Sequence, residues 1–229
     1  MNDSRYNCSP VLCIDSRDRC RAAWISCDID GEFVYTSLVS DTGSFIEPIK
    51  ISNSCDGISG IAIASFREKI AVVWVEEGLR GGLYCKFFEE YPNNEPSILL
   101  VPGLSVPTHP AVYADYSMLV LVWSVRNGHN RHIEGIILND ISLTINKRQI
   151  FTISNEHSSA AYPKAAIKNG IIGIVWQEMT HSISSICFRL LSQEGMQQIQ
   201  TIVSDEECSV AVPAIASSPI GFWLAWQSD

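Results

Sequence analysis

Hydrophobic residues along this chain gather in short runs of strand length, and five of these runs end on a tryptophan. The tryptophans are separated by 50, 49, 53 and 50 residues and stand at Trp24, Trp74, Trp123, Trp176 and Trp226. Such regular spacing predicts a repeated structural unit. About 13 residues before four of these tryptophans, a proline opens another apolar run, at Pro10, Pro110, Pro163 and Pro213, and the second repeat has Gly60 there instead.

The third repeat shows most clearly how one unit folds. Two apolar runs, 111–114 and 118–123, are separated by a short turn and predict a β-hairpin, because both are too short for a typical helix. Asn127 and Gly128 form a strong turn signal before a third run at 132–138. A fourth run follows at 148–153, so the repeat is expected to contain four strands.

The other repeats follow the same plan, at about 10–52, 60–101, 163–203 and 211–226, with the third at 110–153. No segment has a convincing helical period. Four-stranded units of about 50 residues that repeat radially are typical of a β-propeller. We therefore expect an all-β fold, a single β-propeller domain over residues 1–229 with five blades of four-stranded antiparallel sheets and an incomplete last blade.

The last repeat supplies only two strands before the chain stops, and its open edge needs cover because an unpaired apolar strand recruits other chains. One arrangement closes the ring by pairing residues 4–8 with the last blade. The alternative is an open arc that a second subunit completes. The sequence therefore leaves open whether the protein is a monomer or an oligomer.

The repeat pattern resembles the sialidase-like propellers that carry Asp-boxes, with the sequence Ser-x-Asp-x-Gly-x-Thr-Trp. Asp41, Gly43 and Phe45 match the Asp, Gly and aromatic positions of the box, whereas Val39 replaces its first Ser and Ser44 is shifted against its Thr. Residues 192–195 match the box only in part. The resemblance implies a structural turn on the rim rather than a catalytic site. The chain is also similar in size to five-bladed lectins of the tachylectin type.

Composition narrows the classes of partner. Hydrophobic residues make up 46% of the chain and charged residues 18%, which is typical of a globular protein. The net charge of −9 repels phosphate backbones and argues against nucleic acid as a partner. The sequence shows neither a secretory signal nor an apolar stretch of about 20 residues. We expect a cytoplasmic protein without a membrane span.

The eight cysteines are expected to be reduced thiols, because a chain of this size does not need disulfides. Cys85 and Cys187 fall at matching points of two apolar strands and are expected in the core. The four cysteines near the N-terminus contain no Cys-x-x-Cys pair, the usual zinc signature: Cys8, Cys13, Cys20 and Cys27. We predict no metal and no cofactor.

Candidate ligand-binding residues come from the geometry of the hairpins. The start of the first strand and the end of the second lie on the same edge, and innermost strands would bring these edges together around the mouth of a channel. Loops on a rigid scaffold commonly carry function. The predicted ligand-binding residues are Asp28, Glu76, Glu77, His109, Arg126, Tyr162, Gln177, Glu178 and Gln227. The repeated tryptophans are expected in the core, although a stacking platform for sugar rings is the alternative, supported only by Trp223 beside Trp226.

No catalytic residue is assigned. By family resemblance, a sialidase would need three arginines, a tyrosine with a glutamate partner and an Arg-Ile-Pro segment; the segment is missing, and Arg126 is the one arginine expected at the mouth. We therefore expect a noncatalytic module that binds a protein or carbohydrate partner. The alternative is a glycoside hydrolase with carboxylates at the channel mouth as acid and base, since such enzymes need two carboxyl groups that flank one bond.

Overall fold

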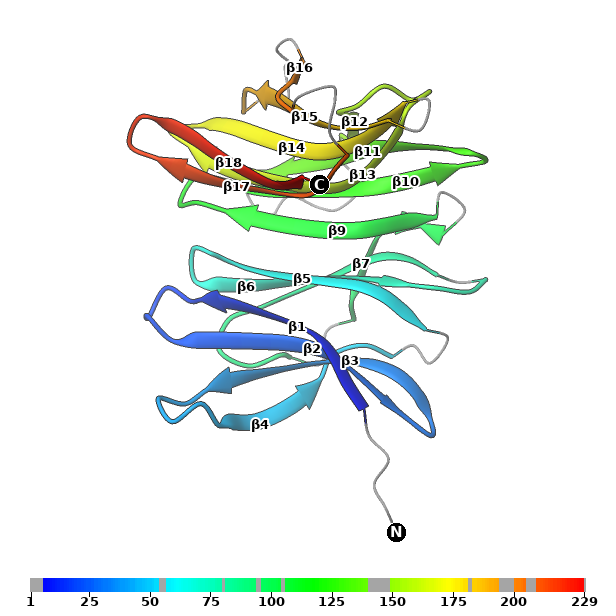
Figure 1. Ribbon diagram of the computed structural model, residues 1–229. Helices are drawn as coiled ribbons and strands as arrows, with labels where there is room; N and C mark the ends of the chain where they lie inside the picture. The colour runs from blue at the N-terminus through cyan, green and yellow to red at the C-terminus, as the bar shows by residue number, and fades with distance from the viewer. Residues whose placement is uncertain are drawn as a thin grey trace. The chain divides into compact units, whose positions relative to one another are not determined.

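The computed structural model describes residues 6–53, 57–79, 81–93, 96–103, 106–139, 149–180, 183–193, 200–204 and 209–228. Within these ranges the chain forms β-strands and no helix (Figure 1). It divides into two compact units, Met1–Val112 and Tyr113–Asp229. The all-β class predicted from the short apolar runs is confirmed.

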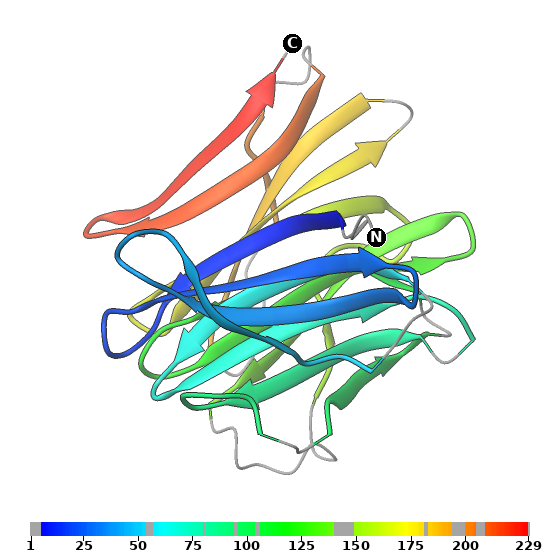
Figure 2. The same cartoon turned by 90° about the horizontal axis from the view of Figure 1, so that it is seen from below.

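Unit 1 contains two four-stranded antiparallel sheets. The first has the order β1 (Tyr6–Ile14), β2 (Cys20–Asp28), β3 (Gly31–Val39) and β4 (Phe45–Lys50). The second has the order β5 (Ile58–Phe66), β6 (Lys69–Glu76), β7 (Gly82–Phe88) and β8 (Ile98–Pro102). In Figures 1 and 2 the blue strands β1, β2 and β3 lie side by side, joined by tight turns. The boundary between the units falls within β9 (Pro107–Ala114).

Unit 2 continues the same plan. In the sheet order, β9 is followed by β10 (Leu119–Asn127), β11 (Asn130–Leu138) and β12 (Phe151–Thr152). The next four strands are β13 (Ser159–Lys168), β14 (Ile171–Thr180), β15 (Ile183–Leu191) and β16 (Thr201–Ile202). A single parallel residue pair between Arg131 and Ser159 connects these two groups, so each is a four-stranded sheet in its own right. A hairpin of β17 (Val210–Ser218) and β18 (Gly221–Ser228) ends the chain.

Among the described residues, β17 and β18 pair only with each other. The expected incomplete last sheet is therefore present. The idea that residues 4–8 complete it is not supported: Tyr6, Asn7 and Cys8 pair with β2 as part of the first sheet, while residues 4 and 5 lie outside the described ranges. A short turn at residues 15–19 follows β1, so this segment pairs with its neighbour in the sequence, β2.

Three of the repeated prolines, Pro10, Pro163 and Pro213, lie in β-bulges in the first strands of their hairpins. The register shifts between Cys8 and Val11, between Ala161 and Lys164, and between Ala211 and Ala214, and each shift encloses a proline. The residue before the proline has a left-handed φ of 50° to 56° at Ser9, His109, Tyr162 and Val212. Proline has no N–H to donate, so a bulge is a place in a sheet that tolerates it. The spacing of about 13 residues thus places the bulge opposite the tryptophan.

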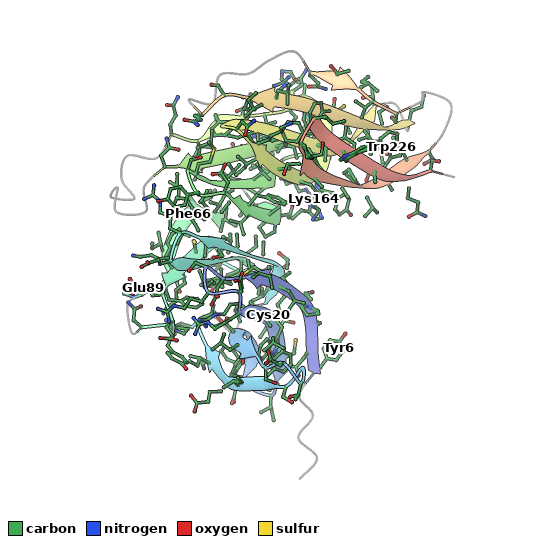
Figure 3. All side chains as sticks on the ribbon, turned by 90° about the vertical axis from the view of Figure 1, so that its left-hand side faces the viewer. Tyr6, Cys20, Phe66, Glu89, Lys164 and Trp226 are labelled. Carbon is green, nitrogen blue, oxygen red and sulfur yellow. The ribbon has the colours of Figure 1, made fainter. Side chains whose placement is uncertain are left out.

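Three of the repeated tryptophans are the largest fully buried side chains among the described residues. Trp74, Trp123 and Trp176 are fully buried, and Trp24 is nearly so, which confirms their expected place in the core. Trp226, labelled in Figure 3, is 37% exposed because its sheet has only two strands. Cys85 and Cys187 are also buried, as predicted.

A buried ion-pair network connects the two sheets of unit 1 at the turn between β1 and β2. Asp15 is 8% exposed and Arg21 is 2% exposed, with 3.1 Å between Oδ2 and Nε. Arg21 Nη1 donates to the carbonyl oxygen of Glu90 at 2.7 Å, and Arg19 forms ion pairs with both Asp15 and Glu90. Burial favours a raised Asp15 pKa, but hydrogen bonds from the backbone N–H groups of Arg19 and Arg17 and from guanidinium groups outweigh it and lower that pKa.

Candidate functional site

The first strand of each hairpin begins where the second strand ends, as the sequence predicts. Ile58 pairs with Glu76 in the second sheet, Ser159 with Met179 in the fourth and Val210 with Ser228 in the last. Within unit 1, β1 contacts β5, and within unit 2, β13 contacts β17. First strands of successive sheets therefore neighbour each other inside each unit. We call the end of a hairpin at which its first strand begins the Trp edge.

The chain also passes from one sheet to the next at the Trp edge. In unit 1, Ile58 N–H donates to Glu32 Oε2 at 2.6 Å, and Glu77 N–H donates to the Gly57 carbonyl at 3.0 Å. In unit 2, Ser184 Oγ donates to the Val210 carbonyl at 2.6 Å. These bonds hold the Trp edges of successive sheets together and give any side chain there a rigid base.

The second strands run four residues past Trp24, Trp123 and Trp176, and two residues past Trp74 and Trp226. The predicted residues after the tryptophans thus lie largely within strands rather than in loops. Side chains two residues apart share a face of a strand. Accordingly, Glu76 Oε1 accepts a hydrogen bond from Trp74 Nε1 at 2.8 Å, and Glu178 Oε2 accepts one from Trp176 Nε1 at 2.8 Å.

The third sheet lacks this pair, because Val125 stands two residues after Trp123. The buried Trp123 Nε1 has no hydrogen-bond partner among the described residues. A carboxylate is still nearby in register, since Glu134 pairs directly with Trp123 across the strands. Glu134 Oε1 lies 3.1 Å from His132 Nε2 instead.

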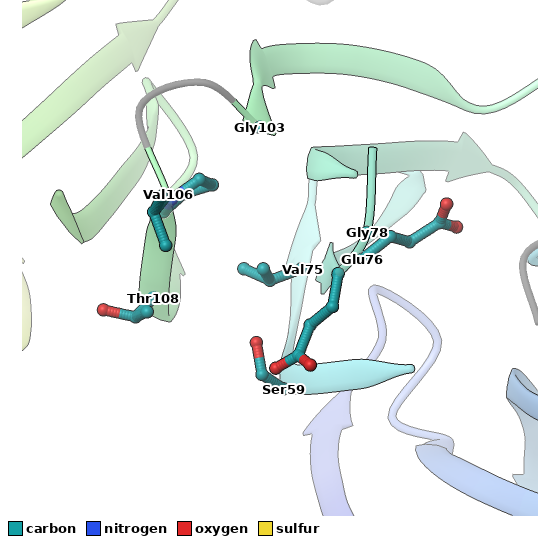
Figure 4. A pocket seen from close by; sticks show the side chains of 9 residues that line it. Ser59, Val75, Glu76, Gly78, Gly103, Val106 and Thr108 are labelled. Carbon is teal, nitrogen blue, oxygen red and sulfur yellow. The ribbon is translucent and has the colours of Figure 1, made fainter. Parts of the chain in front are cut away.

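A cavity of about 280 Å³ opens at the Trp edge of the second sheet (Figure 4). It lies wholly within unit 1, and β5, β6 and β9 together with the two segments that follow β6 and β8 form its walls. The described residues that line it are Ser59, Val75, Glu76, Glu77, Gly78, Gly103, Val106, Pro107 and Thr108. The described lining combines carboxylates and hydroxyls with a few apolar groups, and a concave space with convergent polar groups is a candidate binding site.

Glycines close one wall of this cavity by direct backbone contact. A β-carbon on Gly103 would lie 2.6 Å from the Gly81 carbonyl oxygen, and one on Gly81 would lie 2.4 Å from the Glu76 carbonyl oxygen. Gly103 N–H donates to the Gly81 carbonyl at 2.8 Å. Because no side chain fits between these backbones, both positions require glycine.

Of the predicted residues in unit 1, the structure brings Glu76 and Glu77 together on the cavity wall. His109 follows the lining residue Thr108 in β9 but is not among the described lining residues, and it has a left-handed φ of 50° like the residues before the other repeated prolines. Asp28 ends β2 and accepts a hydrogen bond from the Asp30 backbone N–H at 2.9 Å.

The predicted residues in unit 2 occupy the Trp edges of its three sheets. Arg126 is exposed near the end of β10 and donates from Nε to the Gly128 carbonyl at 3.3 Å. Tyr162, 44% exposed, occupies the bulge of β13, which lies beside the pair of Ala161 and Gln177. Gln177 Nε2 donates to Ser184 Oγ at 2.8 Å, Glu178 binds the Trp176 indole, and Gln227 is exposed on β18.

The predicted residues did not include the part of the cavity wall that comes from β5, from β9 and from the segment between β8 and β9. Ser59 and Thr108 could have been found, because they stand just before the apolar runs of their repeats, where residues were expected to reach the mouth. Gly103 and Val106 come from the segment between two repeats, where the sequence offers no signal of contact. Their contribution depends on how β8 leads into β9.

Two further observations bear on the chemistry of the described residues. They contain no group of three His, Cys, Asp or Glu side chains that could hold a metal ion, and no helix among them could span a membrane. Burial, followed by the nearby Glu178 carboxylate, raises the pKa of Cys187 to about 12, which makes that thiol a poor nucleophile.

No protein-family model and no curated protein sequence matches the chain. Its fold is nevertheless similar to solved structures. An α-L-arabinofuranosidase from Fusarium graminearum matches with a TM-score of 0.62 and 11% identity, over 96% of this chain and 74% of that protein. An α-L-arabinanase from Penicillium chrysogenum matches with a TM-score of 0.58 and 14% identity, also over 96% of this chain and 74% of that protein.

A neuraminidase-like protein of A/flat-faced bat/Peru has a TM-score of 0.58 and 9% identity, over 86% of this chain. The chain spans about half of that protein, 52% of its length. At such identities the similarity shows the fold alone: a β-propeller of the type found in neuraminidase-like proteins and these glycoside hydrolases, as expected from the repeats. The Asp-box of residues 41–45 finds no support from a family model, but it does form a tight turn between β3 and β4, with Gly43 N–H bonded to the Ser40 carbonyl at 2.8 Å.

Proposed function

We propose that the chain is a noncatalytic binding module that holds a carbohydrate in the unit 1 cavity. The observation that carries this proposal is the cavity at the Trp edge, whose wall combines the Glu76 and Glu77 carboxylates with the hydroxyl-bearing Ser59 and Thr108. Sugars are recognised through several such acceptors and donors fixed on a rigid frame. A role connected with carbohydrate also fits the fold, since its neighbours include arabinan-degrading enzymes and neuraminidase-like proteins.

The bond between Glu76 and the Trp74 indole supports binding rather than catalysis. A general acid must donate a proton and a general base must accept one, whereas one oxygen of this carboxylate already accepts a hydrogen bond from a neutral, fully buried partner. Glu76 therefore suits the role of a fixed hydrogen-bond acceptor. The residues in unit 2, above all Tyr162, Gln177 and Gln227, are proposed as a second ligand-contacting edge.

A glycan array followed by calorimetric titration of the discrete hits tests the binding function. Ser59→Phe, which fills the cavity from its exposed rim, is expected to weaken binding at least tenfold. The matched control is Ser217→Phe, at an exposed position of β17 in unit 2. A silent array together with a protein captured by pull-down would favour a protein partner and reject the carbohydrate.

Glycoside hydrolysis is the second candidate. It is favoured by the names of the structural neighbours, several of which are glycoside hydrolases, and by two glutamates on one cavity wall. A panel of chromogenic glycosides, with arabinofuranosides among them, measures this activity. If the chain hydrolyses one of these glycosides and Glu76→Gln or Glu178→Gln abolishes that hydrolysis, glycoside hydrolysis replaces binding as the proposed function.

A further inference from the structure

The last strand of unit 2 has one edge without a neighbouring strand. In each of the other sheets the second strand of the hairpin pairs on both sides, as β2 does with β1 and β3 and β14 does with β13 and β15. Among the described residues, β18 pairs with β17 alone, which lies beside it in Figure 2. A free edge of backbone N–H and C=O groups is a template for another strand. Gly221–Ser228 is therefore a candidate interaction surface.

The last strands of the other four sheets carry features that hinder such pairing. Proteins commonly protect free edges with prolines, charges, bulges or very short strands. Strand β4 contains Glu47, Pro48 and Lys50, and β8 ends on Pro102. Strands β12 and β16 have two residues each. These four edges therefore offer little to an incoming strand.

Beside the two-residue strands, serine side chains bond the backbone of the preceding strand. Ser154 Oγ accepts the Ile133 N–H of β11 at 2.8 Å, and Ser204 Oγ accepts the Ile186 N–H of β15 at 2.9 Å. These hydroxyls occupy backbone donors that a further strand would need. The edges of β11 and β15 are thus partly closed as well.

The first strands of the hairpins are protected too. A proline has no N–H to donate, and a bulge interrupts the regular spacing of an edge. The register of β5 shifts between Ile58 and Gly60. The remaining first strands contain prolines, three of them inside a bulge: Pro10, Pro163 and Pro213 in β1, β13 and β17, and Pro107 and Pro110 in β9.

Strand β18 has none of these features. Its eight residues, Gly-Phe-Trp-Leu-Ala-Trp-Gln-Ser, include no proline and no charged side chain. They form one continuous run, because the extra residue of the register shift in this hairpin lies in β17. Trp223 is 65% exposed and Trp226 is 37% exposed. Such a strand is suited to pairing rather than to contact with water.

A second copy of the chain fits this edge. An incoming strand must itself present an unprotected edge, and within the described ranges β18 is the one outer strand that does. Two identical strands can pair antiparallel across a two-fold axis, so that one surface serves both partners. Although each chain carries a net charge of −9, residues 210–228 contain no ionisable side chain, so no like charges oppose the contact along this hairpin.

We propose that β18 pairs with β18 of a second copy, which joins the two terminal hairpins into one four-stranded antiparallel sheet. A register centred on Leu224 keeps the inner face of each hairpin on the same side of that sheet. It sets Trp226 opposite Phe222 of the second copy. The exposed part of the Trp226 side chain is thereby covered.

Two complete sheets show the same arrangement within one chain. Trp24 pairs directly with Tyr35 across β2 and β3, and Trp74 pairs with Tyr84 across β6 and β7. In both pairs the rings are stacked with their centroids 6.0 Å apart. An aromatic side chain on the neighbouring strand is thus how this chain itself covers two of its repeated tryptophans.

Sedimentation velocity of the full chain over a range of concentrations tests this pairing, in a reducing buffer that excludes disulfide cross-links. The wild type is expected to show a monomer–dimer equilibrium. Ala225→Lys places a charge on an exposed position of β18 where the two copies meet, and should weaken association by about tenfold or more. Ala225→Glu should do the same. A mixture of these two variants should regain the dimer, because opposite charges then face each other; that recovery also shows that both variants fold.

The matched control is Ala214→Lys. Ala214 is exposed and pairs directly with Ala225, but it lies on β17, one strand away from the free edge. The same change of charge there should leave association within about threefold of wild type, because charges that far apart in water are largely screened. A dimer that Ala214→Lys disrupts as strongly as Ala225→Lys is held through the face of the hairpin, and edge pairing is then rejected.

Hydrogen exchange gives a second readout. Amides of Gly221–Ser228 should become better protected as the concentration rises, while those of β6 should not change. A chain that stays monomeric overturns the proposal: protected β18 amides would then mean that another segment of the same chain covers the edge, and unprotected ones that the edge awaits a different partner. A dimer that Ala225→Lys and Ala225→Glu both leave intact places the contact elsewhere and also overturns it.

Discussion

The hydrogen bond between Trp74 and Glu76 gives the sharpest test of how the sheets are held together. Trp74 is fully buried, and its Nε1–H donates to Glu76 Oε1 at 2.8 Å. Glu76→Ala removes the acceptor and leaves the indole N–H without this partner in the core of unit 1. Glu76→Gln keeps a side-chain oxygen at the same place while it removes the charge.

The expected magnitudes differ between these two variants. A buried donor that loses its partner costs about 1–3 kcal/mol, so Glu76→Ala should lower the free energy of unfolding by about 2 kcal/mol. Glu76→Gln exchanges a charged acceptor for a neutral one and should cost about 1 kcal/mol or less. Glu77→Ala removes the adjacent exposed carboxylate and should stay within about 0.5 kcal/mol of wild type.

Urea unfolding followed by hydrogen exchange measures these differences strand by strand. Because the chain has two compact units, exchange in peptides from β6 and β7 should report the loss in unit 1, while peptides from β14 and β15 keep their protection. The reasoning is refuted if Glu76→Ala and Glu77→Ala unfold at the same urea concentration, or if Glu76→Gln is as unstable as Glu76→Ala.

Three further variants probe the ion pairs, the glycine wall and the strained bulges. Asp15→Asn leaves Arg21 buried without its carboxylate and should lower the free energy of unfolding by about 3–5 kcal/mol at neutral pH. Because the folded-state pKa of Asp15 is lowered, the stabilisation by its carboxylate is complete above the usual carboxyl pKa and is lost as pH falls through the lowered value. The free energy of unfolding, measured as a function of pH, should therefore fall less in acid for the variant than for the wild type. Gly103→Ala forces a β-carbon to 2.6 Å from a backbone oxygen and should lower the urea midpoint clearly, whereas Gly221→Ala, with open space around it, should change it little; equal midpoints would contradict the close packing. Val212→Asn should raise the melting temperature of unit 2, because a β-branched residue at a φ of 52° is strained by about 1 kcal/mol, and a lower melting temperature would show that the valine side chain contributes more than its backbone costs.

Much of the candidate site could be anticipated because strands have a simple geometry. Residues at the start of one strand and the end of its hairpin partner must lie on the same edge, and the register of Ile58 with Glu76 follows this rule. The periodic pattern could not show where each strand ends or which way the side chains after the tryptophan point. Strand β14 continues past Trp176 to Thr180, so Glu178 lies within the strand, and its carboxylate binds the Trp176 indole instead of standing in a loop at the mouth. At this position Glu178 supplies the acceptor that a buried indole N–H usually finds, whereas the Trp123 N–H has none among the described residues.

The amino-acid sequence alone established the repeat, its four strands and the incomplete last sheet, because apolar runs, turn residues and the interval from proline to tryptophan are local properties of the chain. It also indicated that each proline and tryptophan belong to one hairpin, although not that they meet at a bulge. Only the tertiary structure brought Ser59, Gly103 and Thr108 to one cavity and placed the Glu32 carboxylate against the backbone N–H of Ile58. Those contacts join residues of different repeats, and the approach of one sheet to the next is set by side-chain packing and bare glycine backbones, which no periodic pattern encodes.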